Sequence, residues 1–149
     1  MQKKLTFHGK ELDIQLSSAA EKQSKTLSST VVIEIQIYFS CLLGKRLAFY
    51  SHESIDNVYP LDKDAFSEIL ADSQTLTENL KLRFNTVMTK ACSVSEQAGP
   101  PPVTDFKIAN QKPYVPSWLT INYKNGIWSG KYGWDMDNKN ISNIKQLSA

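Results

Sequence analysis

Apolar and polar residues alternate over three segments of this chain, and this two-residue period is the feature that most limits its fold. The clearest run covers residues 30–41, and residues 5–16 and 119–134 show the same pattern. Every second side chain of an extended strand lies on the same face, so the pattern predicts half-buried β-strands. In the clearest run the apolar face consists of Ile33, Ile35, Ile37, Phe39 and Cys41.

Turn residues between these runs predict hairpins. Asn125-Gly126 tolerates the positive φ angles of a type I′ turn, and residues 8–10 and 42–45 also carry a glycine between strands. With a two-residue turn at 125–126, alternate residues of the hairpin divide between two faces. One face holds Leu119, Ile121, Tyr123, Trp128, Tyr132 and Trp134; the other holds Trp118, Thr120, Asn122, Lys124, Ile127, Ser129 and Lys131.

The hydrophobic spacing changes after Asp62, which is placed to act as a helix N-cap. Apolar residues then recur at steps of three and four, which is typical of an amphipathic helix. We therefore expect two helices between residues 62 and 92, the second starting near Thr75 and Glu78. The apolar positions are Ala65, Phe66, Ile69 and Leu70, then Leu76, Leu80, Phe84, Val87, Met88 and Ala91.

These patterns together predict an α+β fold. We expect a mainly antiparallel sheet of five to seven strands, with a helical layer at about 62–92 packed on one face. A chain of 149 residues is long enough to bury a sizeable core, so residues 1–149 are expected to form a single globular domain. The polar residues 135–149 are expected to fray.

The net charge of the chain is close to zero. Seventeen Lys and Arg stand against fifteen Asp and Glu, and the excess of +2 lies in residues 93–149. No apolar run is long enough for a membrane span, and the N-terminal residues lack a secretory apolar core. We therefore expect a cytoplasmic protein, in which Cys41 and Cys92 are free thiols.

Known site motifs are matched only in fragments. Residues 126–131 have the wrong glycine spacing for a phosphate-binding loop, and residues 135–146 place Lys139 at a ligand position of a calcium loop. The two Cys and two His residues form no close ligand pair of the kind that zinc sites use. We expect no metal and no cofactor.

A catalytic interpretation would depend on His52. Glu53 and Asp56 are near enough in sequence to orient its imidazole, and Cys92 is a conceivable nucleophile. This group makes a small hydrolase or transferase the alternative hypothesis. An exposed loop histidine beside two acids is the plainer interpretation, so we lean against an enzyme.

The favoured hypothesis is a small intracellular binding or interaction module. Seven of the fifteen aromatic residues fall in residues 106–134, interleaved with lysines. Exposed rings beside lysines can stack on nucleobases or sugars and hold phosphates. The expected contact residues are Trp118, Lys124 and Lys131, with Tyr114 from the proline-rich segment. The partner would be an anionic, nucleic-acid, sugar or protein ligand, and self-association through an exposed strand edge belongs to the same class.

Overall fold

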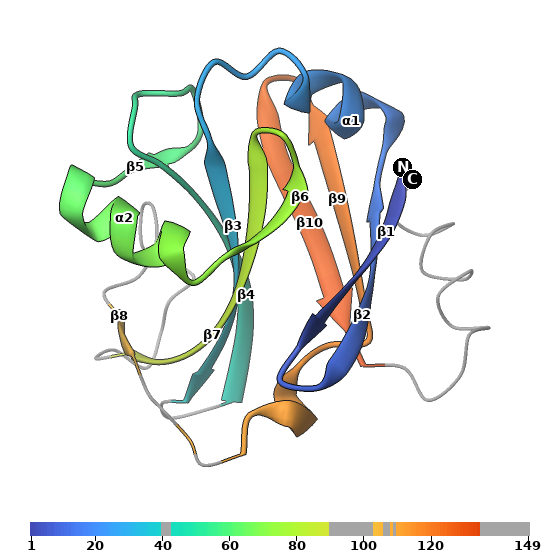
Figure 1. Ribbon diagram of the computed structural model, residues 1–149, viewed down its shortest axis with the longest axis vertical. Helices are drawn as coiled ribbons and strands as arrows, with labels where there is room; N and C mark the ends of the chain where they lie inside the picture. Colours follow the sequence, from blue (N-terminus) through green and yellow to red (C-terminus); the bar gives the residue numbers. More distant parts are fainter. Residues whose placement is uncertain (40–42, 90–102, 106–107, 109, 135–149) are drawn as a thin grey trace.

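Two β-sheets pack face to face in the computed structural model, which describes residues 1–39, 43–89, 103–105, 108 and 110–134 (Figure 1). The described residues form mainly β-structure with two α-helices. The expected layer of helices on one sheet is therefore replaced for the most part by a second sheet.

The smaller sheet has four strands in the order β1-β2-β9-β10. It consists of two antiparallel hairpins, and their inner strands β2 and β9 run parallel, with Asp13 paired to Trp118 and Leu16 to Ile121. The strands are β1 (Gln2–Phe7), β2 (Lys10–Leu16), β9 (Trp118–Lys124) and β10 (Ile127–Gly133).

The larger sheet has the order β5-β4-β3-β7-β6, and the short strand β8 also pairs with β7. Here too the central pair is parallel, because β3 runs beside β7 in the same direction. Both sheets are thus mixed, which corrects the expectation of a mainly antiparallel sheet. The strands are β3 (Val31–Phe39), β4 (Leu43–Ser51), β5 (Tyr59–Pro60), β6 (Gln74–Thr77), β7 (Leu80–Thr89) and β8 (Val103–Asp105).

The helix expected after Thr75 is wrong, because this segment folds as the hairpin β6–β7. Leu76, Leu80 and Phe84 are four residues apart, and a step of four is also two full strand periods. Leu82, which is fully buried, completes the two-residue alternation on β7. The end of the expected helix, Ala91 and Cys92, lies outside the described residues.

The first expected helix is confirmed as α2 (Lys63–Ala71). The Asp62 side chain accepts a hydrogen bond from the amide of Ala65 at 2.8 Å, as an N-cap should. The other α-helix, α1 (Ser18–Ser24), begins after Ser17, and residues 112–114 form a short 3₁₀ helix. In the described part of the chain, neither helix has the length and apolar character required for a membrane crossing.

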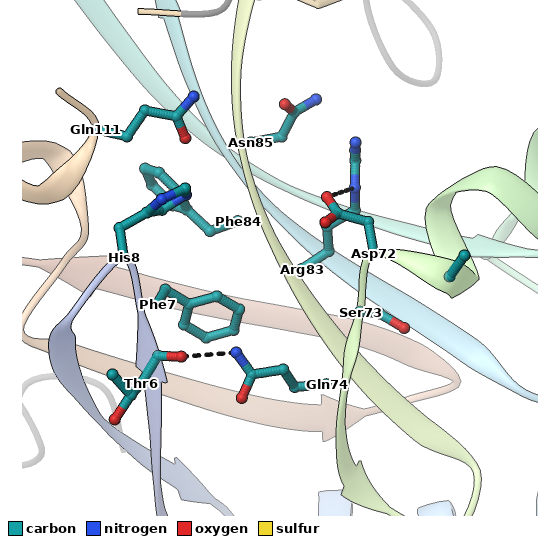
Figure 2. Close-up of a pocket in the computed structure, with 11 residues that line it drawn as sticks. Thr6, Phe7, His8, Asp72, Ser73, Gln74, Arg83, Phe84, Asn85 and Gln111 are labelled. Atoms are coloured by element: carbon teal, nitrogen blue, oxygen red, sulfur yellow. Dashed lines mark hydrogen bonds and ion pairs between the residues drawn. The ribbon is translucent and has the colours of Figure 1, made fainter. Parts of the chain in front are cut away.

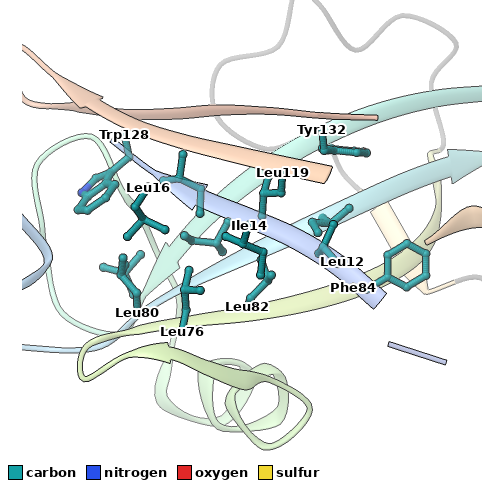
Figure 3. Close-up of a cluster of buried hydrophobic side chains, with 14 of the residues drawn as sticks. Leu12, Ile14, Leu16, Leu76, Leu80, Leu82, Phe84, Leu119, Trp128 and Tyr132 are labelled. Carbon is teal, nitrogen blue, oxygen red and sulfur yellow. The ribbon is translucent and has the colours of Figure 1, made fainter. Parts of the chain in front are cut away.

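The hydrophobic core lies between the two sheets (Figure 3). The C-terminal hairpin contributes most of the face that its alternation predicts, although Trp134 is exposed. Trp128 lies beside Tyr123 with ring centroids 5.0 Å apart. Fully buried side chains from both sheets make up the centre: Leu12, Ile14, Leu119 and Ile121 from the smaller sheet, and Ile33, Ile35, Leu80 and Leu82 from the larger.

Polar contacts join the two sheets along both sides. On one side Lys3 Nζ donates to the carbonyl of Thr75 at 3.1 Å, and Gln74 Nε2 donates to the carbonyl of Thr6 at 2.7 Å. On the other side Lys45 Nζ donates to the carbonyl of Tyr132 at 2.9 Å. The strand β6 starts at Gln74, and a cleft opens next to this point.

Candidate functional site

A polar cleft of about 640 Å³ lies where β1, the start of β6 and the middle of β7 meet (Figure 2). Its walls are formed by residues 6–8, 71–74 and 83–85, together with Gln111. Phe84 belongs to the core face of β7, whereas Arg83 and Asn85 point to the opposite face, so the cleft runs around the edge of this strand. The volume lies in the range of small-molecule sites, about 300–1,000 Å³.

The charged centre of the cleft is Arg83, which binds two carboxylates. Its Nε donates to Asp72 Oδ2 at 3.0 Å, and its Nη1 donates to Glu34 Oε2 at 2.5 Å. Burial lowers the pKa of Arg83, but the two carboxylates outweigh burial, and the pKa is raised overall. The guanidinium therefore stays charged.

The strand register explains how these groups meet. Glu34 of β3 and Arg83 of β7 are direct partners in the parallel pair, on the face away from the core. Gln36 Nε2 donates to the other oxygen of Glu34 at 2.9 Å, so this buried carboxylate is well satisfied. Asp72 belongs to a different element, because it is the C-cap residue of α2.

His8 lies at the mouth of the cleft, on the turn between β1 and β2. The turn has positive φ at both central residues, 51° at His8 and 78° at Gly9. The imidazole ring is edge-on to the ring of Phe84, with centroids 5.9 Å apart. A left-handed conformation is uncommon for a residue with a side chain, and here it holds an exposed ring next to the cleft.

Neutral polar groups supply most of the remaining wall. Ser73 Oγ donates to the carbonyl of Leu70 at 2.7 Å, and the amide of Gln74 is held by Thr6. Figure 2 shows the side-chain amides of Asn85 and Gln111 at the same end of the cleft. Amides both donate and accept, so this wall suits a ligand with several polar atoms.

The expected hairpin surface is not assembled as predicted. Trp118 is only 7% exposed, so its prediction as an exposed stacking ring is wrong. The ring packs over Gly133, its partner on β10, where a Cβ would lie 2.8 Å from Trp118 Cζ2. Within the described residues its indole nitrogen has no hydrogen-bond partner.

The other expected contact residues lie apart from one another. Lys124 and Lys131 are exposed, but Lys124 is at the opposite end of β9 from Trp118. Tyr114 is half-buried, with its ring edge-on to Phe39 at 5.4 Å. These side chains therefore form no shared aromatic platform.

The residues of the catalytic alternative are not brought together either. His52 is exposed, and its Nδ1 lies 3.3 Å from the carbonyl oxygen of Leu61. Glu53 and Asp56 are exposed as well, and in the described chain neither side chain contacts the imidazole through a hydrogen bond or ion pair. Cys92 and Cys41 lie outside the described residues. The described residues also include no group of three or more His, Cys, Asp or Glu side chains placed to hold a metal ion.

Sequence reasoning missed Arg83, Asp72 and Gln111 as site residues. Arg83 lies in the segment that was expected to be helical, and its alternation with Leu82 and Phe84 was the signal for a strand. The sequence places His8 only in the predicted turn at residues 8–10.

Comparison of the chain with protein-family models, with curated proteins and with solved structures finds no match in any of the three. The cleft is therefore the feature from which a function can be inferred.

Proposed function

We propose that the protein is a binding module whose cleft holds a small polar organic molecule. The observation that carries the proposal is the convergence of four separate chain segments on one cleft of about 640 Å³. A charged guanidinium, side-chain amides and the ring pair of His8 and Phe84 line it together. Sites for small ligands combine these features: a concave surface, aromatic contact and a few placed polar groups.

The same geometry favours binding over catalysis. Arg83 is held in its charged form by two carboxylates, so it is a poor proton carrier. The hydroxyl of Ser73 donates its hydrogen bond to a backbone carbonyl. Among the described lining residues, none accepts a hydrogen bond from this hydroxyl in the way that a general base would. A hydrolase would need such a pair within hydrogen-bond reach.

The cleft replaces the C-terminal hairpin as the proposed contact surface. With Trp118 buried, the lysines of the hairpin lose the ring that was to stack on a base or sugar. The general hypothesis of a binding module is kept, whereas its location moves to the opposite side of the smaller sheet, at β1.

The test is an NMR titration of the protein with sugars, nucleosides, amino acids and small carboxylic acids. We expect a binding compound to shift the side-chain amide signals of Asn85 and Gln111 and the imidazole signals of His8. The variant His8→Asn keeps a residue that tolerates positive φ but removes the ring, and it should weaken binding. Lys124→Gln, on the other hairpin, is the control that should bind as the wild type does.

Two results would count against this assignment. One is a panel in which no compound shifts the cleft signals. The other is a set of shifts centred on Lys124 and Lys131, which would return the site to the hairpin.

A further inference from the structure

The two carboxylates that bind Arg83 differ in how firmly they are placed. The Glu34 side chain is 5% exposed and is also held by Gln36, whereas the Asp72 side chain is 67% exposed. Removing a buried partner leaves an uncompensated charge, but an exposed partner can exchange with water or another anion. Glu34 is thus a fixed counter-ion, and Asp72 is an exchangeable one.

The position of Asp72 on its helix also makes it a weakly held partner. Asp72 is the C-cap of α2, and the last turn of this helix contains no basic residue. The carbonyl end of a helix carries partial negative charge, so a carboxylate there is unfavourable unless a cation lies close by. Arg83 supplies that cation, and Asp72 needs only to turn toward solvent to leave it.

The ion pair of Asp72 and Arg83 is part of the wall of the cleft. Both residues line the cleft, and Arg83 Nε is the atom that donates to Asp72. A guanidinium binds carboxylates in a planar, charge-assisted geometry, so an external carboxylate could take this position without moving Glu34. From there the body of such a ligand would reach the side chain of Asn85, which lies on the same face of β7 as Arg83.

We propose that Asp72 holds the place of a ligand carboxylate, and that the cleft takes a small carboxylic acid which displaces Asp72 from Arg83. The inference rests on the proposed binding function and names its ligand class. The exchange replaces one carboxylate on Arg83 with another, so the ion pair is conserved. The displaced Asp72 stays nearby and repels the ligand, so its charge limits the affinity.

The experiment compares wild type with Asp72→Asn, using Asp64→Asn as the matched control. Asp64 lies in the first turn of the same helix, so the control makes the same charge change away from the cleft. The probes are matched acids and neutral analogues: gluconate with glucose, and benzoate with benzamide. Binding is measured from the Arg83 Nε–H signal and the cleft amide signals.

We expect the acids to bind wild type and to bind Asp72→Asn about three- to tenfold more tightly, the gain expected from removing an exposed competing charge. Asp64→Asn should match wild type, and the neutral analogues should be unaffected by either change. Asp72→Ser provides a second variant without the charge, and thermal unfolding checks that each variant is folded.

The outcomes separate the two proposals. Acids that bind Asp72→Asn no better than wild type would overturn the displacement, as would neutral analogues that bind where the acids do not. In both cases binding in the cleft would still stand. If no compound of this or the wider panel shifts a cleft signal, the proposed function fails as well.

Discussion

The hydroxyl of Tyr132 donates a hydrogen bond to the backbone carbonyl of Gln36 at 2.6 Å, across the interface between the two sheets. The same hydroxyl accepts a hydrogen bond from the amide of Arg46 at 2.9 Å. Because Tyr132 is only 3% exposed, one phenol both fills the core and fixes the hairpin β9–β10 against the larger sheet.

Removal of this hydroxyl should destabilise the fold without creating a large cavity in the core. Tyr132→Phe keeps the ring but leaves the partly buried amide of Arg46 without this partner, which should cost about 1–3 kcal/mol in the free energy of unfolding. Tyr123→Phe, on the same hairpin, is the control. Urea denaturation measures both, and equal losses would show that the hydroxyl of Tyr132 contributes nothing specific.

Alkaline pH should destabilise the protein through its buried tyrosines. Burial raises the pKa of Tyr50 to about 12, and the nearby charge of Glu34 adds to this effect. The neutral phenol is therefore preferred in the folded state, so its contribution is complete below pH about 10, where the unfolded phenol is still protonated, and is lost as the pH rises toward 12.

The slope of stability against pH isolates this effect. The free energy of unfolding should fall above pH about 10, by at most about 1.4 kcal/mol per pH unit for one phenol. In Tyr50→Phe the fall should be shallower, whatever the stability of the variant at neutral pH. Identical slopes in wild type and variant would contradict the assigned pKa.

The ion pair of Glu34 and Arg83 should behave as a coupled unit. Glu34→Gln removes the fixed counter-ion of a mostly buried guanidinium and should cost about 3 kcal/mol. In the double variant Glu34→Gln with Arg83→Met, the buried charge is gone, so the total loss should be smaller than the sum of the single losses. A double-mutant cycle from urea denaturation measures this coupling, and additive losses would argue against it.

Replacing Gly130 or Gly9 with alanine should destabilise the protein, for a different reason at each position. At Gly130 a Cβ would lie 2.5 Å from the carbonyl oxygen of Thr120 on the neighbouring strand β9, and 2.7 Å from Leu47 Cδ2 of the larger sheet. At Gly9 a Cβ would meet no atom within 4 Å, so the only cost is the positive φ of 78°, about 1 kcal/mol. Gly130→Ala should therefore lower the melting temperature more than Gly9→Ala, and the reverse order would show that β9 and the Leu47 side chain can both shift to admit a methyl group.

The features that sequence could predict are those fixed by neighbours along the chain. The turn Asn125-Gly126 determines the register of its hairpin, and Asp62 marks the start of α2 through its own side chain. The helix predicted after Thr75 is wrong because a spacing of four residues fits one face of a helix and one face of a strand equally well. Only the polar residues Lys81 and Arg83, on either side of Leu82, distinguish the two.

The cleft could not be predicted in the same way, because its parts meet only through tertiary contacts. Asp72 reaches Arg83 because α2 ends beside β7, and Glu34 reaches it through a parallel register that no local pattern specifies. Trp118 shows the converse limit: alternation placed it on the polar face correctly, but its exposure depends on Gly133 on the neighbouring strand.

The parallel pairing of β2 with β9 has a consequence for how the protein emerges from the ribosome. Asp13 of β2 can pair with Trp118 of β9 only after residue 118 has been synthesised, so the centre of the smaller sheet forms late. Until then Leu12 and Ile14 lack their final neighbours, and a nascent chain that stalls early would leave them open to chaperones and proteases. The smaller sheet is therefore completed only by the hairpin β9–β10, after the strands of the larger sheet have been translated.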